Sequence, residues 1–92
     1  RQMKNELAQP IALGRTAEIY DWGSGQVLKL FHDWFGLGGI QYEQRVAQAI
    51  HASGLPVPAV GEIIHIDGRN GLLYQRVDGV AMWEAMARRN YA

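Results

Sequence analysis

The chain has 92 residues, 48% of them hydrophobic, and its nine basic and nine acidic side chains cancel to a formal net charge of zero. This length allows one small domain, and the balanced charge argues against a basic surface for nucleic acid or membrane. The sequence has no cysteine, which excludes disulfides and thiolate metal sites. The absence of cysteine also fits a cytoplasmic protein, which we therefore expect. No run is long and apolar enough to span a bilayer.

Residues 11–31 are predicted to form three antiparallel strands, because apolar and aromatic side chains are separated there by turn residues. The expected strands are residues 11–13, 19–22 and 26–31, and the expected turns are residues 14–18 and 23–25. The polar residues before Pro10 are expected to form a loose lead-in or a short helix.

A helix is predicted over residues 40–53. Three glycines within residues 32–39 speak against helix in that segment, so a loop is expected there. Gly54 is the expected C-terminal stop of the helix.

Two more strands are predicted after this helix, since the prolines of residues 55–58 hold the chain extended. They are residues 61–66 and 71–76, joined by a hairpin turn at residues 67–70, and residues 81–91 are helical in composition. The predicted fold class is therefore α+β: a five-stranded antiparallel sheet with one packed helix, plus a C-terminal helix.

Lys29 lies between apolar neighbours in the third predicted strand. Burying an ammonium group is costly unless an opposite charge pairs with it. On the predicted helix, Glu43 falls inside the apolar arc formed by Ile40, Ala47 and Ile50, so it also requires a partner of opposite charge. We therefore predict a Lys29–Glu43 ion pair; the alternatives are a glutamate that reaches the rim of the core and a lysine at a strand edge in water.

The three histidines give no sign of a metal site. His32, His51 and His65 lack metal-ligand spacing and have no cysteine partners. No metal ligand is therefore predicted in this chain.

Five segments, taken in order, resemble the N-terminal lobe of the aminoglycoside phosphotransferase and choline kinase family, which is related to the protein kinases. They are residues 13–20 (LGRTAEIY), 27–30 (VLKL), Glu43, 54–58 (GLPVP) and 72–79 (LLYQRVDG). The first hairpin has a single glycine, Gly14, and so departs from the G-x-G-x-x-G pattern of protein kinases. This departure, together with residues 54–58, favours a small-molecule kinase over a protein kinase.

The resemblance implies that Lys29 contacts the α- and β-phosphates of ATP and that Glu43 orients it. The first hairpin would lie over the phosphates, with the Thr16 hydroxyl as a donor. Val27 would lie over adenine and Tyr74 behind it, while the segment after Tyr74 would bind adenine through its main chain. The expected nucleotide-binding residues are Gly14, Arg15, Thr16, Ala17, Val27, Lys29, Tyr74, Gln75 and Val77.

By the same resemblance, residues 1–76 are a nucleotide-binding lobe, and residues 77–92 are the linker and the start of the next helix. The parent protein would be a kinase that transfers the γ-phosphoryl group of ATP to a small hydroxylated acceptor. Its catalytic and Mg²⁺-binding aspartates would lie in a C-terminal lobe. Because the chain has no His-Gly-Asp stretch and begins at Arg1, we expect an inactive piece of a longer protein.

The surface that would face such a second lobe carries Met82, Trp83 and Met86. Exposed in an isolated fragment, these side chains would form an apolar patch. We therefore expect the fragment to self-associate, by exchange of its last helix.

Two other functions remain open at this point. A non-catalytic kinase-like module, regulatory or binding, would keep the fold, with or without the nucleotide. An unrelated small α+β interaction domain would keep neither. The presence of both Lys29 and Glu43 favours the enzyme, because a degenerate site often loses one of the two.

Overall fold

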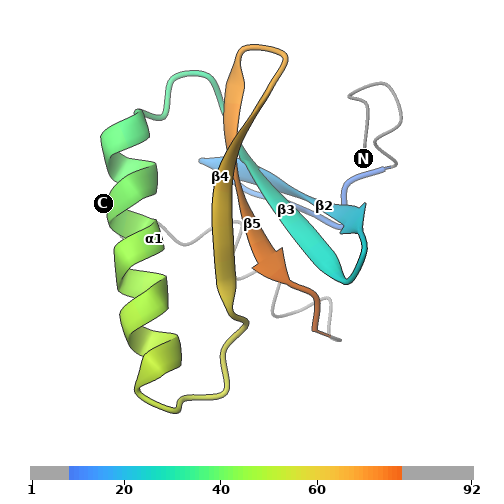
Figure 1. Cartoon of the computed structure of the whole chain (residues 1–92). Coiled ribbons are helices and arrows are strands. Elements are labelled where there is room, and N and C mark those ends of the chain that lie inside the picture. The colour runs from blue at the N-terminus through green and yellow to red at the C-terminus, as the bar shows by residue number, and fades with distance from the viewer. Residues whose placement is uncertain (1–8, 78–92) are drawn as a thin grey trace.

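The computed structural model describes residues 9–77, which form an antiparallel sheet of five strands with one helix packed against it (Figure 1). The strands are β1 (Ala12–Leu13), β2 (Ala17–Gly23), β3 (Gln26–Phe31), β4 (Val60–Ile66) and β5 (Arg69–Gln75), and the helix is α1 (Leu37–Ala52). Their order in the sheet is β1-β2-β3-β5-β4. The predicted α+β class, with five antiparallel strands and one packed helix, is confirmed; the second predicted helix, residues 81–91, lies outside the described residues.

Two hairpins of this sheet turn on two residues each. Ser24 and Gly25 join β2 to β3 with φ angles of 55° and 74°, and Asp67 and Gly68 join β4 to β5 with φ angles of 53° and 78°. Positive φ at both central residues is typical of the type I′ turn, whose twist matches that of the strands. The turn predicted at residues 67–70 is therefore shorter than expected, and β5 begins at Arg69.

Helix α1 begins earlier than the sequence predicts, at Leu37 rather than residue 40. Gly36 is the extended N-cap residue, and its carbonyl accepts hydrogen bonds from the N–H groups of Gly39 and Ile40. The glycine penalty of about 1 kcal/mol each is offset because this first turn brings Ile40 into the core. The predicted C-terminal end of the helix is confirmed: α1 ends at Ala52, Ser53 is the C-cap residue, and Gly54 has a φ of 91°.

The larger part of the core lies between α1 and the sheet. Alternate residues of β3 face the helix, because successive side chains of a strand point to opposite sides. The buried members of this cluster are Ala12, Ala17, Ile19, Val27, Phe31, Phe35, Ile40, Ala47, Leu72 and Tyr74. Within residues 9–77, no helix is long and apolar enough to cross a membrane.

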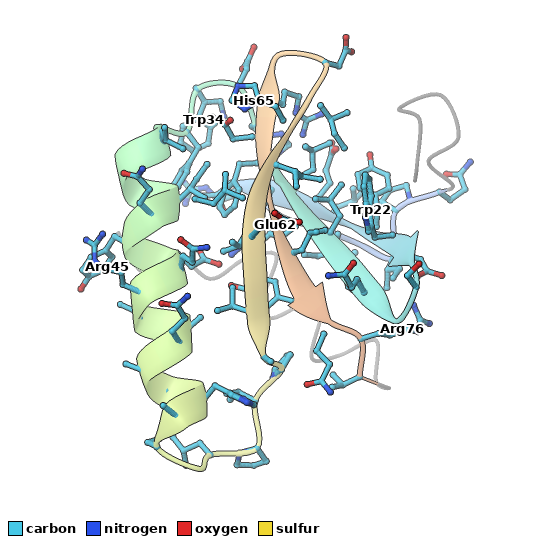
Figure 2. The ribbon with its side chains drawn as sticks, in the orientation of Figure 1. Trp22, Trp34, Arg45, Glu62, His65 and Arg76 are labelled. Carbon is cyan, nitrogen blue, oxygen red and sulfur yellow. The ribbon has the colours of Figure 1, made fainter. Side chains whose placement is uncertain are left out.

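A second apolar cluster lies on the other face of the sheet. Its buried members are Leu28, Leu30 and Leu73, with Tyr20, Trp22, Ile64 and Ile66 packed around them. Figure 2 shows Trp22 on the side of the sheet away from α1. Since β3 contributes to both clusters, its residues from Val27 to Phe31 are all buried, Lys29 among them.

The close fit between β3 and β5 depends on Gly71. A Cβ atom at this position would lie 2.5 Å from Cδ1 of Leu28, which is fully buried, and 3.4 Å from the carbonyl oxygen of Lys29. We expect Gly71→Ala to lower the free energy of unfolding by about 1–3 kcal/mol through overpacking, as measured by urea denaturation.

Gly38→Ala is the matched control, because a Cβ atom there meets nothing within 4 Å. In a helix this change is expected to raise stability by up to about 1 kcal/mol. Equal effects of the two substitutions would contradict the packing account.

Candidate functional site

The centre of the candidate site is an ion pair between Lys29 of β3 and Glu43 of α1. Lys29 Nζ lies 2.8 Å from Glu43 Oε2, and both side chains are 0% exposed. The two side chains therefore meet as the sequence predicts. A charge-assisted hydrogen bond of this length is strong, but each ion has lost its hydration, so the pair is sensitive to the loss of either member.

The strand register and the helical period bring this pair together. In the sheet Lys29 lies between Ile19 of β2 and Leu72 of β5, both buried on the side of α1. On α1, Glu43 lies one turn from Ile40 and from Ala47, which are also buried. The ring of Phe31 covers the ammonium group, with its centroid 5.0 Å from Nζ. The ion pair thus lies within the apolar layer between α1 and the sheet.

Tyr74 of β5 is a third member of the site. Its hydroxyl donates a hydrogen bond of 2.6 Å to Glu43 Oε2, the oxygen that Lys29 also contacts, and the residue is 1% exposed. The resemblance places Tyr74 behind adenine but does not predict this bond. The signal in the sequence is a tyrosine within a buried strand, since a buried phenol needs a hydrogen-bond partner.

The Glu43 carboxylate is used unevenly. Oε2 accepts both donors, whereas Oε1 is buried and has no hydrogen-bond partner among the described residues. An unpartnered buried carboxylate oxygen is costly, because burial has removed its water. The compensation of this buried carboxylate among the described residues therefore comes through Oε2.

The predicted phosphate hairpin, residues 14–17, is held in a tight conformation. The N–H group of Gly14 donates to the carbonyl of Ala17 at 3.0 Å, and the N–H group of His32 donates to the carbonyl of Thr16 at 2.9 Å. The His32 ring lies 3.2 Å from the Gly14 carbonyl through Nε2. Thr16 and Ala17 are buried, whereas Arg15 is exposed.

The predicted adenine-binding residues lie at the other end of β3. Val27 is opposite Tyr74 in the sheet, on the face of Lys29, and Gln26 is opposite Gln75. The N–H group of Gln75 donates to the carbonyl of Ala59 at 2.7 Å, and the partly buried Val77 packs against the core.

The structure therefore brings some predicted residues together and separates others. Lys29, Glu43, Tyr74 and Val27 form one continuous group on the side of α1. Residues 14–17 lie at the Phe31 end of β3, where Ala17 is opposite Phe31, and residues 75–77 lie at its Gln26 end.

A second polar cluster, which the sequence does not predict, lies beside β3. Arg69 Nη2 is 3.1 Å from Glu18 Oε1, and Arg69 Nε donates to the Phe31 carbonyl at 3.0 Å. The Tyr20 hydroxyl donates to Glu18 Oε1 at 2.9 Å. These contacts join β2, β3 and β5, and no local pattern predicts them, because Arg69 and Glu18 are far apart in sequence.

This cluster changes the acidity of two groups. Partial burial of Glu18 opposes its ionisation, but hydrogen bonds from Tyr20 and Arg69 and the charge of Arg69 outweigh burial, so the Glu18 pKa lies below its ordinary value of 4.5. Burial, followed by the hydrogen bond to the Glu18 carboxylate, raises the pKa of Tyr20.

No metal-binding group accompanies either cluster. Among residues 9–77, nowhere do three or more histidine, aspartate or glutamate side chains gather in a way that could hold a metal ion.

No model of a protein family matches the chain, and no curated protein and no solved structure matches it. Evidence for a function therefore comes from the residues of the candidate site and their geometry.

Breaking the buried ion pair is expected to destabilise the fold. We expect Lys29→Met to lower the free energy of unfolding by about 3–5 kcal/mol, because it leaves the Glu43 carboxylate buried without its cation. The double variant Lys29→Met/Glu43→Gln is expected to recover most of this loss, since no charge remains buried and the new side-chain amide oxygen still accepts the Tyr74 hydroxyl. Urea denaturation measures both.

Arg76→Met is the control for this series. Arg76 Nη1 lies 3.1 Å from Asp21 Oδ1, but the two side chains are 45% and 53% exposed. Removing such a surface pair costs at most about 1 kcal/mol. A loss for Lys29→Met as small as that for Arg76→Met would refute the buried, paired arrangement.

The lowered pKa of Glu18 predicts an acid-dependent contribution to stability. The contribution is complete above the ordinary pKa of 4.5 and is lost as the pH falls through the lower pKa of the folded state. We expect Glu18→Gln to destabilise the protein at neutral pH and to match the wild type at the acidic end. Unfolding curves at several pH values measure this, and a difference that does not change with pH would contradict it.

Proposed function

We propose that this chain is the nucleotide-binding lobe of an ATP-dependent phosphotransferase acting on a small hydroxylated acceptor, similar to the aminoglycoside phosphotransferase and choline kinase family. The observation that carries the proposal is the buried Lys29–Glu43 pair, with Nζ and Oε2 2.8 Å apart. In kinases a strand lysine held by a helix glutamate contacts the nucleotide phosphates. Residues 1–76 would form this lobe, and residues 77–92 the connection to a second one.

The energetics of the pair support a functional role. A buried ion pair is often no more stabilising than apolar residues of the same volume. Its presence in a small domain, where stability is limited, therefore favours a use for the ammonium group. Phosphate binding is such a use, because phosphate oxygens form strong charge-assisted hydrogen bonds with an ammonium group.

The arrangement along β3 also supports a nucleotide. Residues 75–77 and Val27 lie toward the Gln26 end, Lys29 lies in the middle, and residues 14–17 lie beyond the Phe31 end. An extended ligand with an apolar base at one end and anionic groups at the other matches this order. Mg²⁺ finds no cluster of carboxylates among residues 9–77, so its ligands, like the catalytic aspartate, are expected in another part of the protein.

One observation favours the second candidate, a non-catalytic kinase-like binding or regulatory module. The Lys29 side chain is 0% exposed, and an ammonium group so enclosed also suits a purely structural pair. In that module the pair would hold α1 on the sheet without transferring a phosphoryl group.

The coding sequence beyond Ala92 distinguishes the two. The proposed enzyme requires a His-Gly-Asp-type loop downstream, followed by a second aspartate near a strand end. A downstream lobe lacking both aspartates would refute the enzyme and leave the binding module. If both aspartates are present, hydroxylated acceptors are screened with labelled ATP.

Nucleotide binding tests Lys29 directly. In the protein that contains this chain, we expect Lys29→Met/Glu43→Gln to weaken ATP binding at least about tenfold, because a phosphate loses its cation, while the neutral pair keeps the fold. Titration calorimetry with ATP measures the affinity, and circular dichroism checks the fold.

Arg45→Gln is the control for loss of a cation away from the site, since Arg45 is exposed on the side of α1 that points away from the sheet (Figure 2). It is expected to bind ATP like the wild type. A wild type that does not bind ATP, or a double variant that binds it unchanged, would overturn the proposal.

A further inference from the structure

Two hydrogen-bond donors of different charge hold the Glu43 carboxylate. Oε2 accepts a hydrogen bond of 2.8 Å from the Lys29 ammonium group and one of 2.6 Å from the Tyr74 hydroxyl. Lys29 is on β3 and Tyr74 on β5, which are neighbours in the sheet. Because Lys29 is opposite Leu72, Tyr74 lies at the diagonal position two residues along, on the same face. Two adjacent strands thus hold one oxygen of one helix residue.

A phosphate that attracts Lys29 competes with Glu43 for the ammonium group. As the ammonium group moves toward the phosphate, the Glu43 carboxylate loses part of the positive charge that stabilises it, while the carboxylate itself stays buried. A buried carboxylate without its cation is strongly unfavourable, and Oε1 has no hydrogen-bond partner among the described residues that would replace it. Anion binding at Lys29 therefore carries a cost at Glu43.

We infer that Tyr74 is a positioning residue that lowers this cost. Its hydroxyl is neutral, so a phosphate does not attract it as it attracts Lys29, and it continues to donate to Oε2. The hydrogen bond then stabilises the ionised carboxylate and keeps it aimed at β3 while the ammonium group shifts. This inference rests on the proposed nucleotide site and adds to it a determinant of how readily Lys29 binds phosphate.

The test compares ATP affinities of the wild type with those of Tyr74→Phe, in the protein that contains this chain. Phenylalanine keeps the ring and removes only the donor. We expect ATP binding to weaken by about fivefold to tenfold. Without the hydrogen bond from Tyr74, the buried Glu43 carboxylate depends on the Lys29 ammonium group alone, so moving that group toward a phosphate costs more free energy.

Tyr20→Phe is the matched control. Tyr20 also donates to a carboxylate, Glu18 Oε1, at 2.9 Å, but it belongs to the cluster on the face away from α1. Both variants lose one phenol–carboxylate hydrogen bond, so both lose stability. Only Tyr74→Phe is expected to change ATP affinity.

A second background separates positioning from simple packing. In the Lys29→Met/Glu43→Gln background, where the neutral pair keeps the fold, no buried carboxylate depends on Tyr74, so adding Tyr74→Phe is expected to change ATP affinity by less than about twofold. An equal loss in both backgrounds, or wild-type affinity for Tyr74→Phe alone, overturns the inference and leaves the proposed function intact. A wild type that fails to bind ATP overturns both.

Discussion

The buried ion pair between Lys29 and Glu43 is the constraint on which the rest of this structure depends. Each ion has lost its water, at an effective cost of several kcal/mol, so β3 and α1 are held at the separation that keeps Nζ and Oε2 2.8 Å apart. The apolar residues on either side, among them Phe31 and Ile40, supply the packing that holds this separation. The larger hydrophobic cluster and the candidate site therefore occupy the same layer, between α1 and the sheet.

The order of the strands gives this layer its third member. β5 returns between β3 and β4, which places Tyr74 beside Lys29 although the two are distant along the chain. Gly71 allows β5 to pack closely, because a side chain there would meet Leu28. On the far side of the sheet, Arg69 connects β5 to Glu18 of β2. The sheet thus carries a charged contact on each face, one buried and one partly exposed.

Much of this arrangement was predictable from local patterns. The glycine-containing turns predicted at residues 23–25 and 67–70 marked the position of both hairpins, although each turn is only two residues long. Gly54 marked the end of α1, because positive φ favours glycine. Lys29 within an apolar strand and Glu43 within an apolar helical arc each indicated a buried charge. Because one is a cation and the other an anion, an ion pair between them was the natural prediction. The start of α1 was predicted wrongly, because Gly38 and Gly39 obscured a first turn that tertiary packing stabilises.

The sequence by itself determined the element types, the hairpins and the Lys29–Glu43 pair, since each follows from a short-range period, a turn residue or an uncompensated charge. Only the tertiary structure decided the Tyr74–Glu43 hydrogen bond, the Arg69–Glu18 contact and the lack of a hydrogen-bond partner for Glu43 Oε1 within residues 9–77. These depend on which strands become neighbours and in which register. Strand order and register are set by the free energy of the whole core, to which no single segment of the sequence corresponds.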